Sequence, residues 1–336
     1  MTLRKGSLGR FALPVDVSDN QLSILTRAAR GWSSRTIRHT MIITKVKNLA
    51  CPLDGLPLTA CATQYGCAQG HSFDVARQGY INLLPVQHKR SKNPGDSPAM
   101  ILARSAFLNS GAYAQIAAAI NKITRELIGG HQGPELCLLD AGCGEGYYLA
   151  QLLHSLQQLP VHQDLVLIGL DISKPAILAA TKRSKQIAWL VASNRQPPLL
   201  PASVDVIFSL FGFPVYDSFE KLMRPAGKLI LVEAGPAHLL ELRTIIYPTV
   251  TEAPAPDLSA AEAVGFEVRS ESRLTYNCAL ISNAQIMNLL TMTPHYFRAS
   301  HAGKQAASEL ETIDITVDVV IRVLEIQRGG DPVRSN

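Results

Sequence analysis

The sequence contains no apolar run of the roughly 18 to 20 residues that a membrane-spanning helix requires. It also lacks a basic segment followed by an apolar stretch and a small-residue cleavage site, which is the pattern of a secretory leader. These two absences disfavour a membrane protein and a secreted protein. We therefore expect a cytoplasmic protein with no membrane partner.

Cysteine is scarce and scattered. The six cysteines stand at positions 51, 61, 67, 137, 143 and 278 of 336 residues, so metal binding or burial accounts for them better than a disulfide framework. The composition is 47% apolar, which is enough to bury a sizeable core and excludes the disordered and fibrous classes. The formal net charge of +5 is a mild bias that identifies no partner by itself.

Changes in composition divide the chain, in which no internal repeat is visible. Residues 1–46 are rich in Arg and Ser, and we interpret them as a poorly ordered extension, with a targeting or nucleic-acid-binding arm as the alternative. We expect a small cysteine-containing module over residues 47–86, a helical linker over 87–125 and a large domain over 126–328. Residues 329–336 are expected to form a frayed tail.

Short apolar runs alternate with helical stretches from residue 136 onward. Runs that are apolar throughout and bounded by Gly, Pro, Asp or Asn are typical of parallel strands buried on both faces. The pattern therefore predicts an α/β fold with a parallel sheet covered by helices. Two later runs, LTYNCALIS and ITVDVVIRVLE, are expected to extend the sheet with an antiparallel member. The parallel runs are ELCLLDAG, DLVLIGLD, IAWLVAS, VDVIFSLFG and GKLILVEAG.

The strongest chemical signal is LLDAGCGEGYYLAQLL, residues 138–153. An apolar strand ends at Asp140, and three glycines then carry the backbone round a tight turn into a helix, where a ligand can touch the main chain. The next strand ends in Asp171, whose carboxylate can accept both hydroxyls of a ribose. The pattern D-x-G-x-G-x-G resembles the S-adenosylmethionine motif of class I methyltransferases, and a structural turn without a nucleotide is the alternative. The turn glycines are Gly142, Gly144 and Gly146.

The stretch after the fourth predicted strand limits which kind of substrate atom can accept the methyl group. It reads SLFGFPVYD and lacks the D/N-P-P-aromatic loop of the adenine-amino and cytosine-amino methyltransferases. Neither Cys137 nor Cys278 stands where cytosine-C5 enzymes carry their nucleophile. We therefore expect direct in-line transfer to a nitrogen or an oxygen, for which positioning is the main requirement.

Residues 51–73, CPLDGLPLTACATQYGCAQGHSF, have the spacing of a small zinc module. Cys51 and Asp54 form one pair, Cys67 and His71 form the other, and twelve residues lie between the pairs. Asp54 stands where the second ligand is usually Cys, and Asp is an acceptable, harder zinc ligand. Cys61 is an alternative ligand, and a module that has lost its metal and is held by packing is the other interpretation.

Several long motifs together resemble the bacterial large-subunit (23S) rRNA guanine-N1 methyltransferases of the RlmA family over about residues 48–325. The resemblance implies a class I, Rossmann-like S-adenosylmethionine-dependent methyltransferase domain preceded by a small zinc-ribbon-like domain that reads RNA. It also implies a target guanine in a hairpin loop of domain II of 23S rRNA, and it suggests a homodimer. The motifs are the cysteine module, QGYINLLPVQHKRSKNPGDS, ARSAFLNSGAY, LLDAGCGEGYY, GLDISKPAI and GPAHLLELRTIIYP.

The resemblance also assigns cofactor contacts. Family members contact the cofactor through the Tyr of the SGAY segment, the glycine turn and the His of GP-x-H, which correspond here to Tyr113, Gly144, Glu145, Gly146 and His238. The clear departure from the family is Asp54 in place of the second zinc cysteine, which bears on the metal and not on the cofactor.

Methylation of guanine N1 requires loss of the N1 proton, unstacking of the base and alignment of N1 with the methyl group. Glu145, Asp96 and His238 are candidate proton acceptors, and the sequence does not choose between them. A small-molecule methyltransferase and a non-catalytic RNA-binding homologue are the alternative functions. The basic run His88, Lys89, Arg90 and Lys92 suits RNA phosphates, with a solvated surface as the alternative. Candidates for stacking on the base, with core packing as the alternative, are Tyr147, Tyr148, Phe211, Phe213 and Tyr216.

Overall fold

The computed structural model describes residues 46–89, 91–129, 131, 133, 135–158, 164–250 and 257–327. The expectations for the N-terminal extension and for the C-terminal tail fall almost entirely outside this part of the chain. Within it, no helix is long and apolar enough to cross a membrane.

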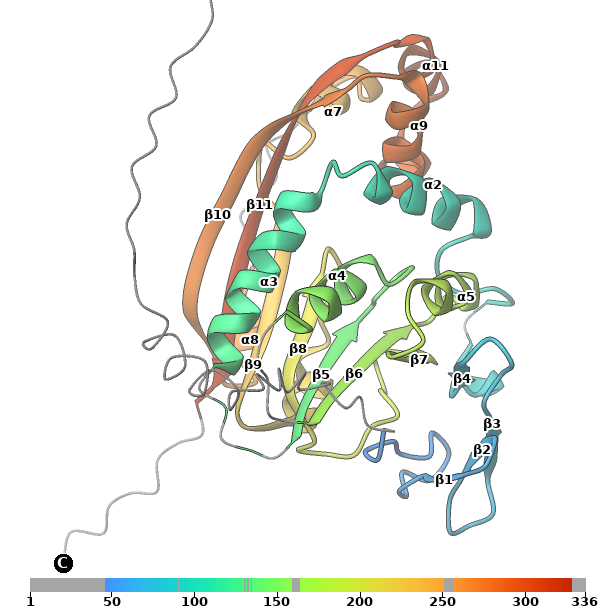
Figure 1. Ribbon diagram of the computed structural model, residues 1–336. Helices are drawn as coiled ribbons and strands as arrows, with labels where there is room; N and C mark the ends of the chain where they lie inside the picture. The colour runs from blue at the N-terminus through green and yellow to red at the C-terminus, as the bar shows by residue number, and fades with distance from the viewer. Residues whose placement is uncertain are drawn as a thin grey trace, which may run out of the picture. The chain divides into compact units, whose positions relative to one another are not determined.

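The centre of the fold is an eight-stranded sheet in the order β10-β11-β9-β8-β5-β6-β7-β4 (Figure 1). All strands from β9 to β4 in this order pair in parallel, whereas β11 pairs antiparallel with both β9 and β10. The predicted α/β fold with an antiparallel extension is therefore confirmed. The strands are β4 (Tyr80–Asn82), β5 (Glu135–Ala141), β6 (Asp164–Asp171), β7 (Ala188–Val191), β8 (Val204–Leu210), β9 (Met223–Ala234), β10 (Phe266–Leu280) and β11 (Ile313–Ile326).

Helices cover both faces of the sheet because its central strands are apolar on both sides. Helices α3, α4 and α5 contribute buried residues to the core on one face, and α6 and α8 contribute to the core on the other. Helix α2 packs against α9, and both lie beyond the carboxyl ends of β5 and β6 (Figure 1). The helices are η1 (Val86–His88), α2 (Pro98–Asn109), α3 (Ala114–Ile128), α4 (Tyr147–Leu156), α5 (Lys174–Arg183), α6 (Tyr216–Leu222), α7 (Leu240–Ile246), α8 (Ser259–Glu262), α9 (Asn283–Met292), α10 (His295–Arg298) and α11 (His301–Glu309).

The cysteine-containing segment forms a small antiparallel sheet of three strands, β1 (Thr59–Cys61), β2 (Gln64–Gly66) and β3 (Ser72–Asp74). Each of these strands has only three residues, so the segment has little core of its own. The chain then continues into β4, which pairs in parallel with β7 at the edge of the large sheet. The small module is thereby joined to the large sheet through β4, the strand that directly follows it.

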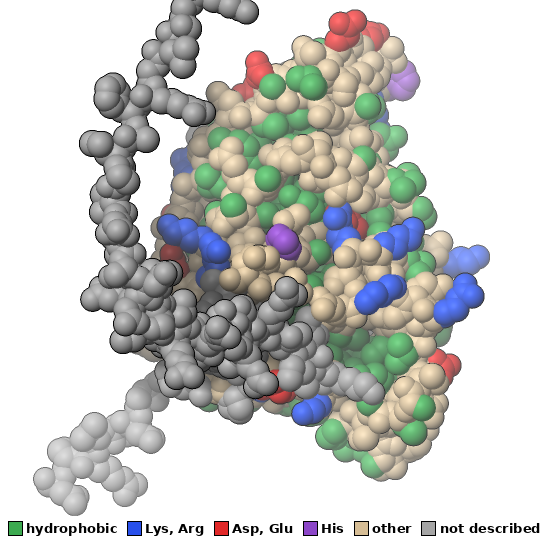
Figure 2. Space-filling view, viewed as in Figure 1, with side chains coloured by type: hydrophobic (Ala, Val, Ile, Leu, Met, Phe, Trp, Pro, Cys, Tyr) green, Lys and Arg blue, Asp and Glu red, His purple; other side chains and the backbone are tan. Residues whose placement is uncertain are grey.

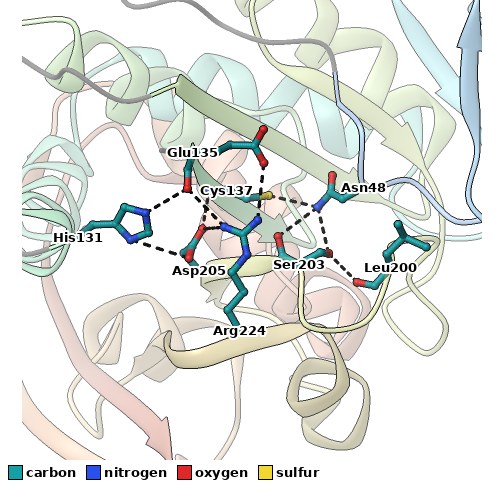
Figure 3. A network of polar contacts seen from close by, with 8 residues as sticks. All are labelled: Asn48, His131, Glu135, Cys137, Leu200, Ser203, Asp205 and Arg224. Atoms are coloured by element: carbon teal, nitrogen blue, oxygen red, sulfur yellow. Dashed lines mark hydrogen bonds and ion pairs between the residues drawn. The ribbon is translucent and has the colours of Figure 1, made fainter. Parts of the chain in front are cut away.

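A polar network fastens the chain just before this module to the large sheet (Figure 3). Asp205 accepts a hydrogen bond from the backbone N–H of Cys137 at 2.8 Å and pairs with Arg224 at 2.6 Å. Asn48 donates from Nδ2 to the backbone oxygen and to the hydroxyl of Ser203, at 3.3 and 3.1 Å. Cys137, Asp205 and Arg224 lie near the amino ends of β5, β8 and β9. The network is therefore at the opposite end of the strands from the glycine turn.

Candidate cofactor site and metal centre

The glycine turn between β5 and α4 has the geometry that the sequence predicted. Gly142, Gly144 and Gly146 have φ angles of +96°, +55° and +81°, a region that side chains other than glycine rarely adopt. A Cβ on Gly146 would also lie 2.6 Å from Cη2 of the Trp189 ring. Glycine is thus required at this point both by the backbone and by close packing.

Two carboxylates lie at the carboxyl ends of neighbouring strands. Asp140 is 2% exposed, and burial, with a contribution from the charge of Asp171, raises its pKa to about 8. Asp171 accepts from the backbone N–H of Gly144 at 2.9 Å and of Ser173 at 2.7 Å, one on each carboxylate oxygen. Each oxygen keeps a second lone pair, which suits two ribose hydroxyls.

Buried polar atoms without a hydrogen-bond partner in the described chain gather around this turn. Such atoms are uncommon in native proteins and mark places where a ligand supplies the partner. A cationic ligand with several polar groups fits these atoms. The buried carboxyl groups can neutralise its positive charge, and the orphan polar atoms can form hydrogen bonds with its polar groups. The orphan atoms in this region are Oδ1 of Asp140, Oε1 of Glu145, the hydroxyl of Tyr148, Oδ1 of Asn194 and Oγ of Ser209; a sixth, Oδ1 of Asn121, lies on α3.

Tyr113 and His238 meet at the same end of the sheet. Nδ1 of His238 accepts the backbone N–H of Asp318 at 3.2 Å, so the neutral ring carries its proton on Nε2. Nε2 lies 3.2 Å from the hydroxyl oxygen of Tyr113 and donates to it, which leaves the Tyr113 proton available to a ligand. Burial lowers the pKa of His238 to about 4, and Phe211 stacks at ring distances of about 6 Å from both side chains.

Asp318 of β11 holds the loop that carries His238. Its side chain is fully buried and accepts from the backbone N–H of Ala237 at 3.0 Å and from Arg273 at 2.7 Å through each oxygen. A Cβ on Gly235 would overlap the same carboxylate, so glycine is needed for this close approach. The sequence did not indicate this role of Asp318, because its partners Ala237 and Arg273 lie 81 and 45 positions away in the chain.

The candidate proton acceptors are not free bases in this structure. Glu145 is 1% exposed and forms an ion pair with Arg183. Asp96 forms an ion pair with Arg104 of α2. His238 has its Nε2 protonated and donating to Tyr113. Each of the three candidates therefore already has a partner, and only Oε1 of Glu145 among their described carboxylate oxygens is a buried atom without one.

The five aromatic side chains that were predicted to stack on the base differ in their exposure to solvent. Phe213 is 89% exposed and Phe211 39% exposed, and both lie just after the carboxyl end of β8. Tyr147 is 5% exposed, the Tyr148 hydroxyl is buried, and Tyr216 packs against the core on the other face of the sheet. The two phenylalanines are therefore the exposed members of this set, whereas Tyr148 and Tyr216 are half-buried.

Four predicted metal ligands come together in the cysteine module. One ligand atom each from Cys51, Asp54, Cys67 and His71 lies within 4.8 Å of the others. Nδ1 of His71 is 3.5 Å from Sγ of Cys51 and 3.4 Å from Sγ of Cys67. A tetrahedral zinc ion places a sulfur and a nitrogen ligand about 3.5 Å apart, so the donor set fits zinc.

Asp54 is suited to its place in this cluster. The backbone N–H of Leu56 donates to Oδ1 at 2.9 Å, and this bond is the main cause that lowers the pKa of Asp54 to about 2. Oδ2 remains directed at Cys67, at 3.2 Å, and at His71, at 2.9 Å. Cys61, the alternative ligand, is exposed and lies outside the cluster.

The basic run after this module is described in part. Lys89 is half-buried and Lys92 is exposed, whereas Arg90 and the side chain of His88 lie outside the described residues. Three further exposed lysines, Lys174, Lys182 and Lys185, belong to α5 or follow it directly. Figure 2 shows Lys and Arg side chains gathered around α5 on this face of the molecule.

A parallel sheet with a glycine turn after one central strand and an acid at the end of the next is common to nucleotide-binding α/β folds, and the D-x-G-x-G-x-G form of the turn is the one found in the class I S-adenosylmethionine-dependent methyltransferases. The chain is such an enzyme, and S-adenosylmethionine is its cofactor. Residues 138–229 match the family model described as "Methyltransferase domain", and residues 49–92 match the zinc-ribbon model described as "RlmA, N-terminal".

Relatives resemble both parts of the chain together. A Bacillus subtilis protein is 31% identical over 81% of this chain and 95% of its own length, and a Micromonospora griseorubida protein is 29% identical over 82% and 96%. Both are named "Putative 23S rRNA (guanine-N(1)-)-methyltransferase", with the suffix YxjB for the B. subtilis protein. A Streptomyces fradiae relative, named 23S rRNA (guanine(748)-N(1))-methyltransferase, is 32% identical over 59% of this chain and 67% of its own. The chain belongs to the RlmA family of 23S rRNA guanine-N1 methyltransferases.

Proposed function

We propose that this protein transfers the methyl group of S-adenosylmethionine to N1 of a guanine in a hairpin loop of domain II of 23S rRNA, with S-adenosylhomocysteine and the N1 proton as the other products. The observation that carries the proposal is the likeness to the B. subtilis relative, which extends over 81% of the chain and so includes the metal module and the cofactor cleft. A small-molecule substrate would require neither the metal module nor the basic surface beside it.

In this proposal the cofactor lies across the carboxyl ends of β5 and β6. Asp171 holds the ribose hydroxyls, and Asp140 offsets the positive charge of the cofactor. Tyr113 donates its hydroxyl proton into the cleft, and His238 fixes the orientation of that hydroxyl. The backbone of the turn contacts the cofactor at Gly142, Gly144, Glu145 and Gly146.

The guanine approaches from the end of β8. Phe213 presents an exposed ring there, and Phe211 has a φ of +53°, a conformation that non-glycine residues keep only where the surroundings hold them. An unstacked base gains back part of its stacking energy on such a ring. We assign Phe213 to the face of the flipped guanine, with N1 directed at the methyl group.

RNA binding uses the basic surface between the metal module and the cleft. His88, Lys89, Arg90 and Lys92 contact phosphates, and the lysines of α5 extend the same surface. Zinc, held by Cys51, Asp54, Cys67 and His71, fixes the fold of the module that presents this segment. The domain limits 47–86, 87–125 and 126–328, a cytoplasmic location and a homodimer remain part of the proposal.

The test is methyl transfer from labelled S-adenosylmethionine to 23S rRNA from a strain without this modification, with the modified nucleoside and its position identified by mass spectrometry. One N1-methylguanosine in the domain II hairpin is the expected product. Guanine 748, for which the S. fradiae relative is named, and its neighbours are the positions to compare. Cofactor binding without transfer to free rRNA or to the assembled subunit would exclude the proposal in favour of a small-molecule substrate or a non-catalytic homologue.

A further inference from the structure

The hydroxyl of Tyr148 is a buried donor without a partner among the described residues. Tyr148 is the second residue of α4, directly after the glycine turn, and its hydroxyl interacts electrostatically with Tyr113, the residue expected to contact the cofactor. A phenol buried in this way loses its hydrogen bonds to water and gains none in return. Its surroundings therefore suit a ligand group that accepts a hydrogen bond.

Arg104 lies on the other side of the same turn. Its Nη1 would be 3.3 Å from a Cβ on Gly144, so the guanidinium rests against the turn where glycine leaves room. Nη1 pairs with Asp96 and Nη2 donates to the backbone oxygen of Met292 at 3.0 Å. A guanidinium has five N–H donors in a planar fork, so these two contacts leave donors for a carboxylate.

Arg104 and Tyr148 also interact electrostatically. The charge of Arg104 favours ionisation of the Tyr148 hydroxyl, although burial outweighs it and raises the pKa of Tyr148. One positive and one neutral donor thus lie near a turn that also has the two buried acids Asp140 and Asp171 beside it.

S-adenosylmethionine carries two positive groups, the sulfonium and the α-ammonium, and one negative group, the α-carboxylate. The buried carboxyl group of Asp140 suits these cations, whereas the cofactor's own carboxylate requires a cation and hydrogen-bond donors. We propose that Arg104 and the hydroxyl of Tyr148 bind the α-carboxylate of the methionine part of the cofactor. Neither residue was assigned to the cofactor by the motifs in the sequence.

The test compares two ligands by calorimetry on the full chain. S-adenosylhomocysteine contains the amino-acid part, whereas 5′-methylthioadenosine has the same nucleoside and thioether without the carboxylate. We expect Arg104→Ala to weaken S-adenosylhomocysteine binding by about tenfold or more and Tyr148→Phe by about threefold to tenfold. Binding of 5′-methylthioadenosine should change by less than about twofold in both variants.

Equal losses for both ligands in Tyr148→Phe, or no loss for S-adenosylhomocysteine, would overturn the assignment. Tyr148→Phe keeps the ring and its packing, so the question is answered even if Arg104→Ala folds poorly.

Asp96→Asn is the matched control, because it removes the ion pair of Arg104 and leaves the guanidinium free. That variant should bind S-adenosylhomocysteine as well as the parent protein or more tightly. A loss as large as that of Arg104→Ala would show that the ion pair with Asp96, and not the ligand contact, sets the affinity.

Discussion

At the scale of single residues, Asp140 and Asp171 set the charge of the cofactor cleft. Asp140 has a pKa near 8 in the free protein because its carboxyl group is buried close to Asp171. A cationic ligand stabilises the ionised carboxylate, so its pKa is lower in the complex than in the free protein. Binding of the cofactor therefore releases a proton at pH values between the lowered pKa of Asp140 in the complex and about 8.

The first prediction follows from the direction of this shift. The affinity for S-adenosylmethionine should rise with pH up to about pH 8, by no more than about tenfold per pH unit, and level off above it. Calorimetry in two buffers of different ionisation enthalpy measures the released proton directly. Asp140→Asn should remove both the proton release and this pH dependence. Proton uptake, or an affinity independent of pH in the parent protein, would contradict the assignment.

The second prediction concerns the ribose contact. Asp171→Ala should weaken binding of S-adenosylhomocysteine by about tenfold or more, because two hydrogen bonds to a charged acceptor are lost. Asp164→Ala, at the opposite end of the same strand, is the matched control and should leave the affinity unchanged. Circular dichroism checks that both variants keep the fold. Unchanged calorimetric affinity in Asp171→Ala would rule out the ribose assignment.

The third prediction concerns the exposed ring after β8. Phe213→Ala should lower kcat/KM for rRNA by about fivefold or more, because base stacking on an aromatic ring contributes about 1–3 kcal/mol. Cofactor affinity should not change, and Phe213→Trp should restore most of the activity. Methyl transfer to an rRNA fragment gives the kinetics, and calorimetry gives the cofactor affinity. A parallel loss in both measurements would assign Phe213 to the cofactor and not to the base.

At the scale of elements, the metal module depends on its ligands more than on its packing. Its three strands have three residues each, and most of their residues are exposed. The module is nevertheless fixed to the large sheet by β4 and by the network at Asn48. Loss of the metal should therefore loosen the module while the large sheet stays folded.

The fourth prediction is that the purified protein contains about one zinc per chain and that Asp54→Cys holds it more tightly, since thiolate is a softer zinc ligand than carboxylate. Competition with a chelator, followed by elemental analysis, measures the difference. Cys61→Ser should retain zinc as the parent does, because Cys61 lies outside the cluster. Protein without zinc, even when expressed with added metal, would show that Asp54 has abolished the site.

At the scale of the whole molecule, the basic surface around α5 is the region suited to a large anionic partner. Lys182 of α5 is exposed, and so is Lys92, which precedes α2. Surface charges of this kind act mainly by releasing counterions from the nucleic acid, so their contribution depends on salt.

The fifth prediction is that Lys92→Glu combined with Lys182→Glu weakens binding of the rRNA hairpin and makes the slope of log K against log salt less steep by about 0.7 or more per lysine. Fluorescence anisotropy at several salt concentrations measures the slope. Lys122→Glu is the matched control, because Lys122 is 73% exposed on α3 and pairs with Glu126. An unchanged slope in the double variant would place the RNA elsewhere.

Local patterns in the sequence predicted much of this protein. The buried parallel strands were visible because each is apolar on both faces, and the glycine turn was visible because its backbone angles require glycine. The four metal ligands were visible because their spacing along the chain is short. Where one short segment contains the whole signal, the residues themselves determine the structure.

Only the tertiary structure decided which distant residues meet. Tyr113 and His238 are 125 positions apart and share a hydrogen bond. The length of the edge strand β10 could not be predicted, because most of its residues are exposed and the apolar pattern of a buried strand is missing. The neutral state of His238 depends on burial and on a backbone N–H of β11, and the place of Arg104 depends on the packing of α2 over the glycine turn. Such contacts arise only when the helices and strands pack together. The periodicity of side chains shows which face of a helix or strand is buried, but it does not show which other element covers that face.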